Sequence, residues 1–261
     1  ANASTEGGFA MAGVDYGRSV GWRFGGAIGF ATSESEQVLA GGGSASSRVE
    51  SVQVTGYAAY RSDTIQALLA ASYGDHTARA GRTAVVGGVS LPVSGSLGAT
   101  SYDLTAQIGY TVTNGALRAT PVAGITWQRI EMDAGSMAGS PAAFDLTSYT
   151  DSFTTARAGL DVGYIFSGPG YTFEPRAYAG YANRLSDESE TISGDFAGTP
   201  GSQGFVLASG LDAENEWFEL SVGGIARMDN GIDLSVSYET RAGNDRIRDV
   251  DVFMLGLRTR F

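Results

Sequence analysis

The sequence predicts an all-β protein, a transmembrane antiparallel up-and-down β-barrel with eleven strands in this chain. Three observations predict this fold. Apolar residues alternate with polar or small residues at every second position in almost every segment. Aromatic residues gather at both ends of the apolar faces, and short turns alternate with long connections rich in Gly, Ser, Asp and Thr.

The alternation defines each strand in order. The expected strands are 9–16, 22–30, 52–60, 65–73, 102–110, 117–127, 156–166, 171–181, 218–228, 232–238 and 250–261. Short turns are expected at 17–19, 61–63, 113–115, 167–170 and 229–231, and long connections at 33–47, 76–98, 132–152, 185–213 and 244–249. Asn114-Gly115 and Asn230-Gly231 are strong signals for tight turns. The short turns are expected on the periplasmic side.

The face opposite the apolar residues is polar, small or charged. The residues expected to face a lumen are Asp15, Arg23, Asp103, Arg118, Arg157, Asp161, Glu174, Arg176, Glu219, Asp233, Glu239, Arg241, Arg258 and Arg260. A soluble core does not accept unpaired charges, whereas a wet lumen does. These residues indicate either a hydrophilic channel, open or plugged, or a charge ladder that only satisfies a wet interior.

The last strand carries the clearest pattern. Phe253, Leu255, Leu257 and Phe261 alternate with Gly256, Arg258 and Arg260, and Thr259 keeps the register. A strand that is apolar on one face and cationic on the other fits a wall with lipid outside and water inside.

The spacing of aromatic residues supports a membrane span. Trp22 and Phe30 are eight residues apart on one face, as are Tyr102 and Tyr110. In a tilted strand this spacing covers roughly 20 Å, close to the ~25 Å apolar band of an outer-membrane barrel. Strands favour aromatic residues in general, but this preference does not explain their clustering at both ends.

Composition excludes several classes of function. The 261 residues contain no cysteine, which excludes disulfides and thiolate metal sites. All 17 basic residues are arginine, so phosphate-loop and Schiff-base lysines are impossible. The net charge is −11 and the arginines are dispersed, which argues against nucleic acid as a partner. No apolar run is long enough for a membrane helix.

Several motifs, taken in order, resemble the C-terminal β-domain of type V autotransporters. The chain begins with a Gly-x-x-x-Gly-x-Asp-Tyr-like strand that ends at Asp15-Tyr16, and 22–30 continues the match. Thr120-Pro121, Arg157-Ala158-Gly159 and Glu174-Pro175-Arg176 follow, and the loop 195–202 is similar to a recurring family loop. The end, Gly256 to Phe261, resembles the terminal signal of the family, although Thr259 stands where an aromatic residue is more usual.

The resemblance implies a translocator domain that anchors an N-terminal passenger at the cell surface and assists its export. It implies twelve strands, a linking helix in the lumen, and recognition by the outer-membrane assembly machinery through Phe253, Leu255, Gly256, Leu257, Thr259 and Phe261. The surroundings would be outer-membrane lipid and lipopolysaccharide. We therefore expect residues 1–261 to form one barrel domain that lacks its first strand and lumen helix, with a longer precursor supplying that strand. A stand-alone outer-membrane pore is the alternative.

Little in the sequence suggests catalysis, and we expect neither an enzyme nor a cofactor. His76 is the single histidine, no Gly-x-Ser-x-Gly motif occurs, and we expect an inert, exposed loop residue. The carboxylates at 187–190, and Glu34 with Glu36, lack calcium-loop spacing. Solvated loops are the simpler interpretation, so no metal site is predicted.

Overall fold

The computed structural model describes residues 3–17, 20–39, 43–186, 191–196, 204–208, 215–243 and 250–259. Within these ranges, eleven long strands follow one another in chain order around a single sheet. They are β1 (Ala3–Gly17), β2 (Gly21–Val38), β3 (Ser44–Arg61), β4 (Ile65–Val86), β5 (Val89–Tyr110), β7 (Leu117–Met132), β10 (Tyr149–Tyr164), β12 (Tyr171–Arg184), β15 (Glu216–Met228), β16 (Ile232–Gly243) and β17 (Val250–Thr259).

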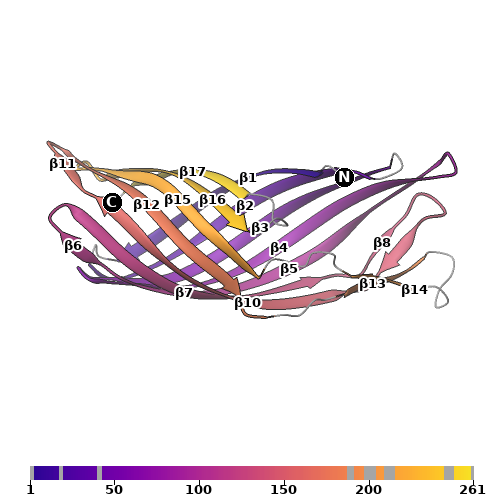
Figure 1. Ribbon diagram of the computed structural model, residues 1–261, viewed down its shortest axis with the longest axis horizontal. Helices are drawn as coiled ribbons and strands as arrows, with labels where there is room; N and C mark the ends of the chain where they lie inside the picture. Colours follow the sequence, from indigo (N-terminus) through magenta and orange to yellow (C-terminus); the bar gives the residue numbers. More distant parts are fainter. Residues whose placement is uncertain are drawn as a thin grey trace.

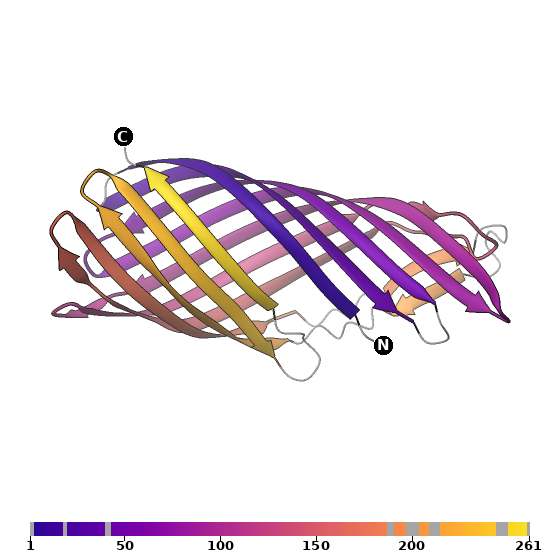
Figure 2. The ribbon, with the colours of Figure 1, turned by 90° about the horizontal axis from the view of Figure 1, so that it is seen from above.

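Each neighbouring pair of these strands is antiparallel, and the sheet curls into a tilted wall (Figures 1 and 2). The all-β, up-and-down fold is therefore confirmed, and all eleven predicted strands are present. Short strands β6 (Val112–Asn114) and β11 (Phe166–Gly168) extend the sheet beside β7 and β12. No helix among the described residues is long and apolar enough to cross a membrane.

One end of the wall, here called the turn end, carries the short connections. Gly115 and Gly231 adopt φ values of 61° and 86° there, directly after Asn114 and Asn230. This left-handed region is strained for residues with a side chain, so the two predicted Asn-Gly turns need glycine. The opposite end is called the loop end.

Two of the expected long loops are mostly strand. The 33–47 connection reduces to residues 39–43, because β2 and β3 remain paired up to Val38 and Ser44. The 76–98 connection reduces to the Gly87-Gly88 turn, because β4 and β5 pair up to Val86 and Val89. The extensions of β2 and β3 are largely polar on both faces, so they lack the apolar alternation that predicts a strand, yet backbone pairing still forms them. The extension of β5 does alternate, with Val89, Leu91, Val93 and Leu97 on one face, but it was not assigned to a strand from the sequence.

A second, four-stranded sheet lies at the loop end beside the far part of β5 (Figure 1). It contains β8 (Gly135–Met137), β9 (Phe144–Leu146), β13 (Thr191–Phe196) and β14 (Gly204–Ala208), in the order β14-β13-β9-β8. These residues come from the two long connections expected at 132–152 and 185–213, which were predicted to be loops. An isolated bridge between Ser94 and Ala138 joins this sheet to β5.

Most of the large apolar side chains lie on the outside of the wall. Among the described residues, only Val93, Met137 and Ala182 are buried apolar residues, whereas Leu255 is 77% exposed. Ring contacts mark both ends of the apolar band: Trp22 and Tyr60 lie 5.3 Å apart at the turn end, and Tyr73 and Tyr102 lie 5.4 Å apart at the loop end. A soluble protein would not leave so much apolar surface in water, so this band faces lipid.

The sheet is open along a seam between β1 and β17 (Figure 2). The two strands run in the same direction, because an odd number of strands alternates between them. Within the described residues no ladder joins them, and the contact across the seam is the ion pair of Arg258 Nη2 with Asp15 Oδ2 at 2.7 Å. One strand running the opposite way would be antiparallel to both edges.

Candidate functional site: the lumen and the seam

The inner face carries charges that meet across neighbouring strands. Glu174 of β12 is almost fully buried at the turn end. Its Oε2 accepts a hydrogen bond from Arg227 Nη1 of β15 at 2.8 Å, and its Oε1 lies 3.5 Å from Arg118 Nη1 of β7. Two guanidinium groups therefore compensate the desolvated carboxylate, which makes its burial tolerable.

Asp15 joins three strands at the seam. Its carboxylate accepts two hydrogen bonds from Arg258 Nη2 of β17, at 3.0 and 2.7 Å, and Arg23 Nε of β2 lies 3.1 Å from Oδ2. Because each of these hydrogen bonds is charge-assisted, the cluster is the strongest polar link that the described residues show between β1 and β17.

The remaining predicted lumen residues form smaller groups on the same face. Arg176 donates to both oxygens of Asp161, through Nε at 3.2 Å and with Nη2 at 2.9 Å. Arg241 lies 3.8 Å from Glu219 and 3.5 Å from Glu239. Gln128 donates to Asp103. Except for Arg241 with Glu239, which both lie in β16, these pairs join adjacent strands and link them on the inner face.

Three predicted lumen residues behave differently. Arg157 Nε is buried without a hydrogen-bond partner. Asp233 lies opposite both Arg227 and Arg258 in the strand register. Arg260 lies outside the described residues.

Tyrosine rings fill much of the room that the inner glycines leave. A Cβ built on Gly25 would lie 2.5 Å from Tyr57 Oη, and one on Gly159 would lie 2.6 Å from Tyr178 Cε2. Neither tyrosine was placed on the lumen face from the sequence. Their positions opposite glycines, on the polar face of each strand, are the signal that was available.

The inner face encloses a chamber of about 1010 Å³ at the turn end. Every long strand except β10 contributes to its lining, from Asp15 of β1 to Arg258 of β17. Arg61 lines this chamber too, and sequence analysis missed it by assigning it to a turn. Its place in the period-2 series with Tyr57 and Ala59 puts it on the inner face of β3.

His76 is not the exposed loop residue that was expected. It lies within β4, and its ring is held between two serines, with Nδ1 2.8 Å from Ser51 Oγ and Nε2 2.9 Å from Ser101 Oγ. It pairs with Ser51 in the ladder on the inner face, because β4 continues beyond the membrane band.

The candidate cation sites find no support in the structure. Glu34 is paired with Arg48 at 2.9 Å on the outer face. Residues 187–190 lie outside the described part of the chain, and the described part contains no group of metal-ligand side chains.

The C-terminal strand presents its apolar residues to the outside. Phe253, Leu255 and Leu257 are all exposed, and they pair in register with Tyr238, Val236 and Leu234 of β16. Gly256 pairs with Ser235 and Thr259 with Ile232. Phe261 lies outside the described residues.

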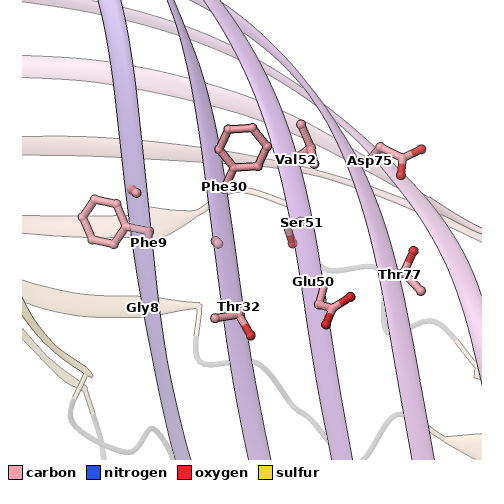
Figure 3. Close-up of a pocket in the computed structure, with 11 residues that line it drawn as sticks. Gly8, Phe9, Phe30, Thr32, Glu50, Ser51, Val52, Asp75 and Thr77 are labelled. Atoms are coloured by element: carbon pink, nitrogen blue, oxygen red, sulfur yellow. The ribbon is translucent and has the colours of Figure 1, made fainter.

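A groove of about 550 Å³ marks the upper border of the apolar band on β1 to β4 (Figure 3). Phe30 and Val52 supply its apolar part, and Glu50, Asp75 and Thr77 supply its polar part. The outer wall changes here from a lipid-compatible surface to a hydrated one.

Apolar outside, charged inside and antiparallel throughout, this wall defines an outer-membrane barrel protein. The autotransporter β-domain family matches residues 1–239, and the chain belongs to this family. It is an outer-membrane translocator domain of the kind found in Gram-negative bacteria. The match ends before β17.

Solved structures with the same fold include three autotransporter domains. The translocator domain of NalP from Neisseria meningitidis has a TM-score of 0.79 at 16% identity, covering 99% of this chain and 82% of that one. The β-domain of Bordetella BrkA has a TM-score of 0.66 at 20% identity, covering 99% and 92%. The transport unit of AIDA-I from Escherichia coli has a TM-score of 0.67 at 11% identity, covering 99% and 84%. Among curated proteins, nothing matches.

Proposed function

We propose that this domain holds an N-terminally attached passenger in the outer membrane and that the passenger crosses through its lumen. The observation that carries the proposal is the wall itself, which is apolar outside and lined by Asp15, Glu174 and their arginines inside. Such a wall anchors a chain in lipid and offers a polar path across it. Neither task needs a catalytic residue, so we propose no enzymatic activity.

The seam supports a further part of the proposal: one more strand, supplied by a longer precursor, closes the wall between β1 and β17. Both edges run the same way, so a single strand is antiparallel to each of them. The completed domain would then have an even number of strands, as bacterial single-chain barrels do.

The upper part of β1 supports a segment in the lumen. Phe9 and Met11 lie opposite Ala31 and Gly29, on the same face as Asp15, and both are exposed. Large apolar side chains on a wet face gain from being covered. A linking segment between passenger and barrel is the occupant that we propose.

The partners that we propose follow from these surfaces. The apolar band contacts outer-membrane lipid, and its upper border lies where lipopolysaccharide would meet it. The C-terminal strand, with Phe253, Leu255 and Leu257 on its outer face, is the signal for the outer-membrane assembly machinery.

Surface display tests the main proposal. A reporter polypeptide, preceded by a signal peptide, is fused before Ala1 and expressed in a Gram-negative host. Protease added to intact cells is expected to degrade the reporter and leave the barrel intact. A fusion to an unrelated outer-membrane barrel of the same abundance serves as the control. An inserted barrel whose reporter stays protected in the periplasm would contradict the proposal.

A stand-alone pore is the second candidate, because the chamber of about 1010 Å³ is lined by charged residues. The same display experiment separates the two functions, since a pore without an export role leaves the reporter in the periplasm.

A further inference from the structure

The ion pairs of the turn-end half are asymmetric in their exposure. Arg227 is 29% exposed but its partner Glu174 only 4%. Arg258 is 41% exposed against 20% for Asp15, and Arg176 is 36% exposed against 21% for Asp161. In each pair the carboxylate lies against the wall and the guanidinium group reaches into the lumen.

The charges that line the chamber are also unequal in number. Five arginines line it, Arg23, Arg61, Arg176, Arg227 and Arg258, against two carboxylates, Asp15 and Asp233. Glu174 and Asp161, the partners of Arg227 and Arg176, lie behind these arginines against the wall, so the surface that the water meets is mainly cationic. Arg61 forms no ion pair within 4.0 Å among the described residues, and the nearby carboxylate of Glu174 is already bound by Arg118 and Arg227. The outer face shows no such bias, because Arg48 and Glu34 are exposed to similar degrees there.

We infer that the turn-end chamber is a site for small inorganic anions such as chloride and phosphate, and that it makes the open lumen anion-selective. Rings of arginine select anions in other pores, because their fixed charge raises the local concentration of the opposite sign. The net charge of −11 for the whole chain would suggest the reverse preference. The inference needs only a water-filled lumen and does not depend on passenger export.

The test is the reversal potential of the full 261-residue protein in a planar lipid bilayer under a KCl gradient. Chloride is expected to permeate roughly threefold more readily than potassium at low ionic strength, with the preference falling as salt screens the arginines. The double variant Arg61→Gln with Arg227→Gln should bring the permeability ratio of chloride to potassium close to one. Glu174 keeps Arg118 as an ion-pair partner in this variant, so its buried carboxylate is not left uncompensated.

Two further variants keep the test decisive. Asp233→Asn removes a lining carboxylate and should increase the anion preference, even if the arginine variants do not fold. Arg48→Gln with Arg79→Gln, on the outer face, should leave the ratio unchanged. A cation-selective wild-type pore, or a ratio insensitive to the lining charges, would overturn the inference. None of these outcomes bears on reporter display.

Discussion

At the residue scale, the inner face is organised by contacts between glycines and tyrosines. The ring of Tyr57 lies over Gly25 of the neighbouring strand, and that of Tyr178 lies over Gly159 and Gly180. Each ring covers backbone that would otherwise face the lumen and narrows the channel at its own level. The glycines are therefore required for close packing and not for left-handed backbone.

This packing predicts the effect of added side chains. Gly25→Val should destabilise the folded barrel by about 1–3 kcal/mol, because the Tyr57 ring must move or the strands must separate. Gly56→Val is the matched control, since a Cβ there meets nothing within 4 Å. Urea unfolding in lipid vesicles measures both. Equal stability of the two variants would mean that the tyrosine does not occupy this position.

At the element scale, β17 is both an edge of the seam and the proposed assembly signal. It pairs with β16 along its length, and its outer face carries Phe253, Leu255 and Leu257. The terminal Phe261 continues this face in the sequence, beyond the described residues. An aromatic residue at the turn-end border would complete the apolar pattern that we propose as the assembly signal.

Removal of Phe261 is therefore expected to lower the amount of inserted barrel several-fold, while Phe261→Tyr, which keeps an aromatic end, should insert normally. Heat-modifiable migration of membrane fractions in gels reports insertion. Wild-type insertion of the truncated chain would show that the signal lies elsewhere.

At the scale of the whole molecule, a few polar contacts hold the two edges of the open seam, β1 and β17, near each other at the turn end. Asp15 binds arginines of β2 and β17, whose ends lie far apart in the chain. The apolar band does not draw the two edges together. The free energy gained when the outer face of each strand contacts lipid is the same whether or not β1 and β17 lie side by side. The ion pair between Asp15 and Arg258 favours the approach of β1 and β17 at the turn end.

Asp15→Asn should consequently weaken the barrel by about 1–3 kcal/mol, since it removes charge-assisted hydrogen bonds across the seam. Asp161→Asn serves for comparison, because Asp161 pairs with Arg176 of the adjacent strand, where a backbone ladder remains. The temperature at which the protein unfolds in detergent gels is expected to fall more for Asp15→Asn. A larger fall for Asp161→Asn would contradict this role for the seam.

The sequence by itself determined the strands, their two faces and the Asn-Gly turns, because alternation and turn chemistry are local properties. It did not show that β4 and β5 project far beyond the band, because the β4 extension has no large apolar residue between Asp75 and Thr83, and the alternation at 89–97 of β5 was not assigned to a strand. Only the tertiary structure determined which carboxylates and arginines form ion pairs. Asp15 and Arg258 are 243 residues apart, and Glu174 and Arg227 are 53 apart, so their pairing depends on curvature and register. The cationic sign of the chamber follows from those pairings, because it depends on which partner of each pair reaches the water.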